Sequence, residues 1–477
     1  MVLLVFSIGC IVRAVPDLVA HPYPVGYDVI NYYIPVITNF QEHWAIVSQQ
    51  FPLYVLILHS FQLATDLEPQ ALVIASAIIL YGIFSISVFS ISRKILGLSE
   101  LYSLYLTLFV IFQLPVLRTA WDLHKDIFSL ALLLIALSLL HPVRAKIGRY
   151  SIITSYIAAS IAVSLDKMVG ALFVASLMSY AFAIRVRYTT YLSLVVGVVF
   201  ATMIASDFGN LQQFFQTSAG EAKSKPSNIH LGDYNPKNLL ILVVLVNGSL
   251  LIPGGFGFVV SNNRLLKIAV AITVMGSFSW LIFPDSQSLA ADRWIFLFGT
   301  FLSIFAGYGI IKYSQTKIRS NYRTHVLCLV LGLSITLGLL YETMPYQFGM
   351  VLEKVLGQSL EPFGPATLQF NSIPVEDNGE LLKTITWINE NTPKNATLIG
   401  EKHWRGWMEI KLQHARSFNF FSSQLAALQY IQDCELEHCY LLIRSSDSLD
   451  HTIGQEAIDQ VYKSKLFKIF KIGRPKG

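Results

Sequence analysis

The dominant pattern along the chain is a series of long apolar runs separated by short polar stretches. Runs such as Ala71–Ile91 and Leu239–Val260 have about the 17–25 residues that a helix needs to cross a bilayer core. Because backbone polar groups find no water there, we expect helices. About eleven runs qualify, some of them as tilted or partly buried spans: 2–15, 70–92, 100–117, 126–140, 151–165, 168–184, 189–206, 238–260, 265–283, 294–312 and 325–341.

The run 51–64 is different because Pro52, His59 and Gln62 interrupt it. We interpret it as an interfacial or re-entrant helix. The predicted bundle is therefore residues 1–341, with outer loops at 16–69, 117–125, 207–237 and 284–293.

Beyond residue 341 the pattern becomes that of a soluble domain, 342–477. Helix and strand patterns alternate there, which favours a small α/β layered domain, and roughly 130 residues suffice for a separate core. We expect a helix over Leu381–Ile388 that ends at Asn389–Pro393, and further helices and strands in this order: strand Thr397–Ile399, helix Gln424–Gln432, strand Tyr440–Ile443, helix 454–462 and strand 466–472.

Composition and charge support a multi-pass membrane protein. The 477 residues are 53% hydrophobic and only 14% charged, too apolar for a soluble protein of this size. With these spans, the Lys and Arg clusters fall on one face, which the positive-inside rule makes cytoplasmic: Arg93 and Lys94; Arg144, Lys146 and Arg149; Arg185 and Arg187; Arg264 and Lys267; Lys312, Lys317, Arg319 and Arg323. The net charge of +5 is then a membrane signature and gives no reason to expect a nucleic acid partner.

The opposite face, which receives the outer loops and the tail, is expected to be extracytoplasmic at the cell membrane. Cys434 and Cys439 in the tail are either a disulfide or two buried thiols. Asn395-Ala396-Thr397 matches the glycosylation acceptor pattern, on the side where such modification occurs.

The first candidate site is the loop Gly26-Tyr27-Asp28-Val29-Ile30-Asn31-Tyr32-Tyr33. Asp28 beside a bilayer can act on the head group of a lipid-borne substrate, or it can simply cap the helix expected from Val29. Tyr27 and Tyr32 can stack on a sugar or anchor the loop at the interface.

Two further segments place charge at the same face. The stretch Arg118–Asp126 holds Asp122, His124 and Lys125, which can orient an acceptor, a divalent ion or a phosphate, or can form a solvated loop. Arg293 can bind a lipid phosphate or pair with Asp292. Arg13, near the end of the first run, can likewise bind a phosphate or form a structural ion pair.

This order of features resembles the GT-C superfamily of membrane glycosyltransferases, which use polyprenyl-phosphate sugars. The resemblance lies in Arg13, the Gly26-Tyr27-Asp28 turn, the charged second loop, Arg293 and the outer tail. It implies that Asp28 is the catalytic base or orients the acceptor, and that Arg293 binds the phosphate.

For the other candidate residues we predict roles from their chemistry and position. Asp122 would assist in catalysis, and the other candidates would contact substrate: Arg13, Tyr27, Tyr32, His124 and Lys125. A divalent cation, Mg or Mn, would use Asp28 and Asp122. The acceptor would be a lipid, a glycan or a protein, and one displacement would invert the anomeric centre.

Two departures from the motifs of related transferases narrow the type of enzyme that we expect. Protein O-mannosyltransferases carry Asp-Glu in the first loop, whereas Val29 follows Asp28 here. Oligosaccharyltransferase catalytic subunits carry Trp-Trp-Asp-Tyr-Gly in the tail, whereas this chain has His403-Trp404-Arg405-Gly406-Trp407. A monosaccharide transferase is the better match. The rival class is a transporter or lipid-linked-sugar flippase, against which the sparse charge within the spans argues.

Overall fold

The structure is a computed structural model of the whole chain, and it describes most of the bundle and the tail sheet. The described residues are 1–47, 52–140, 149–184, 190–204, 236–281, 291–344, 377–401, 404–413, 417–421, 438–445 and 458–472.

Within the described residues, each apolar run expected to span the membrane is helical over most of its length. The long helices are α1 (Val2–Ala20), α5 (Pro69–Lys94), α6 (Glu100–Ile111), α7 (Leu114–Asp122), α8 (His124–Leu140), α9 (Arg149–Leu165), α10 (Lys167–Ile184), a helix over Thr190–Ile204, α12 (Pro236–Val260), α13 (Arg264–Ser277), α14 (Ala291–Lys317) and α15 (Ser320–Thr343). Ser279–Leu281 adds a turn of 3-10 helix, η2, after α13.

Five of the described helices are long and apolar enough to cross a membrane: α1, α5, α12, α14 and α15. The count becomes six if α6 and α7, which meet at a bend of 63°, together form one broken span. The break falls at Phe112 and Gln113, and Pro115 is the second residue of α7, which follows. The number of eleven spans stays a prediction.

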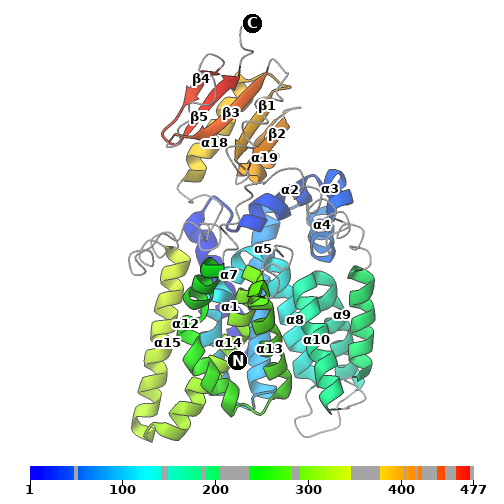
Figure 1. Cartoon of the computed structure of the whole chain (residues 1–477), viewed down its shortest axis with the longest axis vertical. Coiled ribbons are helices and arrows are strands. Elements are labelled where there is room, and N and C mark those ends of the chain that lie inside the picture. Colours follow the sequence, from blue (N-terminus) through cyan, green and yellow to red (C-terminus); the bar gives the residue numbers. More distant parts are fainter. Residues whose placement is uncertain are drawn as a thin grey trace.

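Shorter helices lie across the tail-side end of the bundle, and they build the first loop. They are a π-helix η1 (Val29–Tyr33), α2 (Ile34–Thr38), α3 (Phe40–Val47) and α4 (Leu53–Thr65) (Figure 1). The run 51–64 is thus helical as expected, and it lies beside α2 and α3 at this end (Figure 1).

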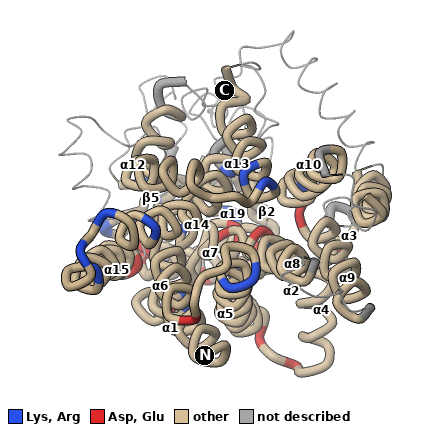
Figure 2. Tube along the Cα trace, turned by 90° about the horizontal axis from the view of Figure 1, so that it is seen from below, with Lys and Arg blue, Asp and Glu red and all other residues tan. Residues whose placement is uncertain are grey.

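Basic residues gather at the end of the bundle that faces away from the tail. Seen from below, Lys and Arg mark the turns that α5, α13 and α15 share with their neighbours (Figure 2). The predicted clusters at Arg93, Arg264 and Arg319 lie at these turns. Arg144, Lys146, Arg185 and Arg187 lie outside the described residues, as does the loop 207–235.

The tail contains a five-stranded mixed sheet with the order β2-β1-β3-β5-β4. Its strands are β1 (Thr397–Glu401), β2 (Ser417–Phe421), β3 (Cys439–Arg444), β4 (Ile458–Lys463) and β5 (Phe467–Ile472). β2, β1 and β3 are parallel, and β5 and β4 run antiparallel to them. Helices α18 (Asn378–Asn391) and α19 (Arg405–Lys411) pack on the bundle side of the sheet (Figure 1).

Most of the expected tail elements are present: the helix over Leu381–Ile388, and the strands at 397–399, 440–443 and 466–472. The helix expected over 454–462 is wrong, because Ile458–Lys463 is β4. Ser464 closes a tight hairpin there, with its hydroxyl accepting the Phe467 N–H at 3.0 Å. The helix expected over Gln424–Gln432 lies outside the described residues.

The structure describes one of the two cysteines of the tail. Cys439 is disulfide-bonded, while Cys434 lies outside the described residues. Cys10 and Cys328 are free thiols, as expected of residues in apolar helices.

The tail rests on the first loop through α19. This helix contacts η1 and α2, and Ile30 of η1 packs into the core of the tail with Trp404, Trp407 and Leu381. Helix α19 thereby lies over the loop that carries Asp28 (Figure 1). One core thus joins the tail to the predicted site.

Candidate active site

The Gly26-Tyr27-Asp28 turn is docked on the end of α7. Gly26 has a φ of +116°, and a Cβ there would lie 2.3 Å from the Trp121 carbonyl oxygen, so only glycine fits. The next peptide N–H, that of Tyr27, donates to Oδ1 of Asp122. The turn therefore takes its position from the carboxyl end of α7.

Asp28 forms an ion pair with Arg293 across the top of the bundle. Its Oδ2 lies 3.5 Å from Nη2 of Arg293, which is in the first turn of α14. The side chain of Asp28 makes no capping hydrogen bond to η1, so the capping interpretation is wrong. The side chains are 22% and 30% exposed, which leaves both within reach of a ligand.

Arg293 lies among further carboxylates. It interacts electrostatically with Asp126 and Asp166, both fully buried. Asp166 accepts the N–H groups of Met168 and Val169, and so caps α10. The Nζ atom of Lys125 lies 3.9 Å from Oδ2 of Asp166, so the amine forms an ion pair with this carboxylate.

Asp122 is paired below the turn. Its Oδ2 lies 2.5 Å from Nη1 of Arg118, one helical turn earlier, and both side chains are buried. Asp122 thus serves as an anchor for the turn in this arrangement. Arg118 also interacts electrostatically with Asp28 and with Tyr341, so it lies between the turn and the end of α15.

Arg13 and His124, two predicted substrate contacts, are buried inside the bundle. Arg13 is 1% exposed, and its guanidinium pairs with Asp17 at 2.6 Å and donates to the Ala120 carbonyl at 3.1 Å. It therefore ties α1 to α7.

His124 is held on both ring nitrogens. Nε2 lies 3.2 Å from the Trp121 carbonyl and Nδ1 lies 3.3 Å from the Tyr54 hydroxyl, while Tyr33 stacks on the ring. A carbonyl can only accept, so Nε2 is the protonated nitrogen. In this arrangement His124 supports the loop from below.

Tyr27 and Tyr32 lie near enough to Asp28 to interact with its charge. Burial, followed by the charges of Asp28 and Asp122, raises the pKa of Tyr27. Burial and then the charge of Asp28 raise the pKa of Tyr32 to about 12. Both phenols therefore stay neutral at physiological pH and keep a proton to donate.

The expected divalent cation finds no ready set of ligands. Among the described residues, no group of three or more His, Cys, Asp or Glu is placed to hold a metal ion. Asp28 and Asp122 are each paired with an arginine. The cation stays a prediction.

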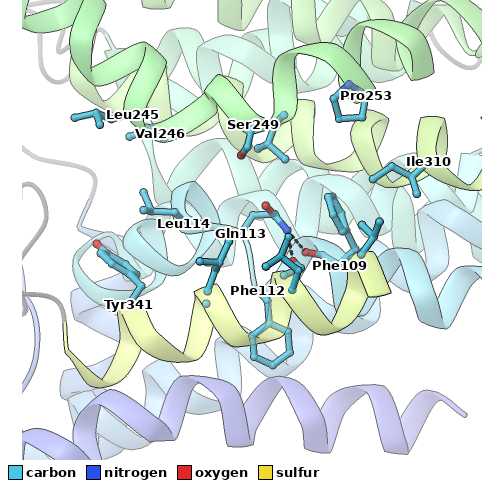
Figure 3. Close-up of a pocket in the computed structure, with 16 residues that line it drawn as sticks. Phe109, Phe112, Gln113, Leu114, Leu245, Val246, Ser249, Pro253, Ile310 and Tyr341 are labelled. Carbon is cyan, nitrogen blue, oxygen red and sulfur yellow. Dashed lines mark hydrogen bonds between the residues drawn. The ribbon is translucent and has the colours of Figure 1, made fainter. Parts of the chain in front are cut away.

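An apolar crevice opens beside this cluster, between α12 and α15 (Figure 3). Its volume is about 340 Å³, and its floor is the break between α6 and α7. Leu333 and Leu337 on its α15 wall are 57% and 47% exposed, so the crevice is open to the surrounding lipid. Gln113, which donates to the Ser334 hydroxyl at 2.5 Å, is its main polar feature.

The upper end of the crevice meets the buried charges. Tyr341 lines it and stacks on Trp121, with ring centroids 4.5 Å apart. Trp121 directly precedes Asp122 and donates to Glu342 at 3.3 Å. A path of packed side chains thus runs from the lipid-facing crevice to the Arg118–Asp122 pair.

With this geometry, the chain resembles a solved membrane protein over nearly its whole length. One match is ArnT from Cupriavidus metallidurans bound to undecaprenyl phosphate, with a TM-score of 0.54 and 13% sequence identity. It covers 98% of this chain and 97% of that one. The chain therefore shares its fold with ArnT, as the resemblance to the GT-C superfamily predicted. No protein-family model and no curated protein matches the sequence.

The sequence does not single out Asn31 or Tyr341 as site residues, and it offers Arg118 only as one cation of the charged stretch Arg118–Asp126. Arg118 and Asp122 are four residues apart, as are Arg13 and Asp17, and that spacing on a helix was the available signal for both pairs. Nothing in the sequence indicates that Asn31 meets the tail.

Proposed function

We propose that this protein is a membrane glycosyltransferase that moves a sugar from a polyprenyl-phosphate donor to an acceptor hydroxyl. The observation that carries the proposal is the partly exposed Asp28–Arg293 pair, above a lipid-facing crevice, in a fold shared with ArnT. One base and one phosphate-binding cation side by side are what such a transfer requires.

The ion pair is the resting state of the site. When the donor binds, its phosphate takes the place of the Asp28 carboxylate on Arg293, whose planar guanidinium suits phosphate oxygens. Asp28 is then released as a base. It accepts the proton of the acceptor hydroxyl while that oxygen attacks the anomeric carbon.

The bond between the anomeric carbon and the phosphate oxygen breaks as the new glycosidic bond forms. A single displacement inverts the configuration, and Arg293 stabilises the charge that develops on the leaving phosphate. Asp122 acts through the turn it anchors. Lys125 adds positive charge near the phosphate, and the neutral phenols of Tyr27 and Tyr32 donate to sugar oxygens.

The isoprenoid chain of the donor lies in the crevice between α12 and α15. A volume of about 340 Å³ falls within the usual range of ligand sites, and its apolar walls match a hydrocarbon. Its contact with Tyr341 and Trp121 leads the phosphate end toward Arg118 and Arg293. The tail and the first loop lie outside the cell membrane, where a lipid, glycan or protein acceptor arrives.

Transfer in liposomes tests this proposal. Purified protein is mixed with undecaprenyl-phosphate-linked sugars labelled in the sugar, together with a cell-envelope lipid and glycan extract. We expect label to leave the polyprenyl phosphate and appear in the extract, without nucleotide sugar. Label that crosses the bilayer while still attached to its lipid would instead indicate a flippase.

A further inference from the structure

The side chain of Asn31 joins the tail to the turn that carries Asp28. Its Oδ1 accepts the backbone N–H of Gly406 at 2.9 Å, at the start of α19. Its Nδ2 donates to the Tyr27 carbonyl at 3.0 Å. One amide thus connects the tail backbone to the residue that precedes Asp28.

The contact between α19 and this loop is close enough to exclude any side chain at position 406. A Cβ on Gly406 would lie 2.2 Å from the Ile30 carbonyl oxygen and 2.8 Å from the Asn31 Cα. Tyr23 packs edge-on against Trp407 beside it, with ring centroids 6.2 Å apart. The two backbones therefore meet directly, with aromatic packing on one side.

Asp28 depends on these contacts because its own side chain does not bind the helix it precedes. The peptide of Tyr27 is fixed from two directions: Asp122 of the bundle receives its N–H, and Asn31 reaches its carbonyl. The helix that follows is a π-helix, an uncommon form that is frequent at functional sites.

We propose that α19 of the tail is part of the catalytic apparatus, with Asn31 and Gly406 as positioning residues for Asp28. The kinetic consequence of this proposal rests on the proposed function. The contact between α19 and the Asp28 turn rests on the geometry alone. The tail holds the Tyr27 carbonyl, and so the Asp28 carboxylate, at the place where it meets Arg293 and the acceptor.

The chain offers a matched control at the other end of α19. Asn389 makes the same two kinds of bond, donating to the Lys411 carbonyl at 2.8 Å and accepting the Gln413 N–H at 3.0 Å. These bonds stay within the tail. Asn31→Ala and Asn389→Ala therefore remove similar amide contacts from the same helix, and only the first touches the Asp28 turn.

We expect Asn31→Ala to lower kcat by about 10- to 100-fold, the size of effect that a small misplacement of a catalytic group produces. The donor KM should stay within about twofold, since Arg293 is untouched. Asn389→Ala should leave kcat per folded molecule unchanged. In an Asp28→Asn background, Asn31→Ala should have little further effect, because it acts through Asp28.

Hydrogen exchange on the same proteins tests the contact without relying on activity. In Asn31→Ala, the amides of 26–33 and of Gly406 should exchange faster, whereas Asn389→Ala should leave residues 26–33 unchanged. Gly406→Ala, which forces the backbones apart, should reproduce the Asn31 result. Unchanged exchange in 26–33, or an equal loss of kcat with Asn389→Ala, would overturn the proposal. A wild-type protein without transfer activity would refute the proposed function alone. The exchange data would still decide whether α19 positions the turn that carries Asp28.

Discussion

At the residue scale, the charged groups of the site differ in their access to water. Arg13, Arg118, Asp122 and Asp166 are buried and paired, so removing one partner would leave a buried charge, at a cost of about 3–5 kcal/mol. Asp28 and Arg293 remain partly exposed. Because they are partly exposed, Asp28 and Arg293 can separate and bind a ligand instead. The buried pairs hold the surrounding helices in place.

Arg293 is therefore predicted to act on the donor. Arg293→Lys keeps the positive charge but loses the planar fork that holds two phosphate oxygens. We expect the KM for the polyprenyl-phosphate donor to rise by about tenfold, corresponding to about 1.4 kcal/mol, while the acceptor KM changes little.

Arg323→Lys is the control for this substitution. Arg323 donates to the carbonyls of Ser314 and Gln315 at the far end of the bundle, so its replacement should leave both KM values unchanged. A rise in the acceptor KM alone with Arg293→Lys would contradict the role assigned to Arg293.

The sequence predicts most of the charged residues near the tail-side mouth, but it does not single out Asn31 or Tyr341. Asp28 and Arg293 were both expected at the tail-side mouth, and the structure brings them into one ion pair. Burial was harder to foresee: Arg13 and His124 look like surface groups beside a membrane, yet both are enclosed. Enclosure depends on how α1, α7 and α8 pack, which local pattern does not specify.

At the element scale, the crevice depends on α15 standing away from α12. Both helices pack on α14, and the broken pair α6–α7 supplies the floor between them. The bend follows from Pro115, which has no N–H to continue α6, and from the turn at Phe112 and Gln113, whose N–H groups bond back to the Val110 carbonyl. A break in a span thus provides both an apolar groove and the helix end that holds Asp122.

Filling this crevice should weaken donor binding. Ser249 is exposed on its α12 wall, so Ser249→Trp places an indole in the groove without disturbing the core. We expect the donor KM to rise at least fivefold, about 1 kcal/mol, with kcat at saturation little changed.

Val259→Trp on the same helix is the control, because Val259 is 74% exposed and does not line the crevice. Equal donor KM values for the two tryptophan variants would show that the isoprenoid chain binds elsewhere.

Elements with a strong period were predictable from the chain, and those shaped by contacts were not. The long apolar helices and the strands around Leu398 and Leu441 follow their patterns. The alternation in β4 is too short to distinguish it from a helix in the sequence, and its strand form comes from pairing with β5. The π-helix at Val29 and the short α19 exist where the tail meets the loop, which is a tertiary effect.

At the scale of the whole molecule, the basic turns and the tail lie at opposite ends of the bundle (Figures 1 and 2). The positive-inside rule then predicts that the tail lies outside the cell. Labelling with a membrane-impermeant maleimide tests this, with Cys10 and Cys328 replaced by serine. Lys383→Cys, on an exposed helix of the tail, should react in intact cells.

Thr316→Cys, at the other end, should react only after the cells are opened. The reverse pattern would invert the topology and remove the extracytoplasmic site.

The whole-molecule arrangement was the part that could be anticipated best, because hydropathy and charge act over many residues. The docking of the tail on the first loop was not anticipated, since it depends on single contacts such as Asn31 with Gly406. Those contacts join residues 375 positions apart in the chain.

The most direct test of the account is transfer by Asp28→Asn in liposomes with a labelled undecaprenyl-phosphate sugar. Asn keeps the size of the side chain, and Asp28 makes no capping bond, so the variant should fold. Asp66→Asn, at the end of α4, is the control. We predict a loss of about 10²–10⁴-fold in turnover for Asp28→Asn and none for Asp66→Asn. Transfer by Asp28→Asn at the wild-type rate would contradict the assignment of Asp28 as the base.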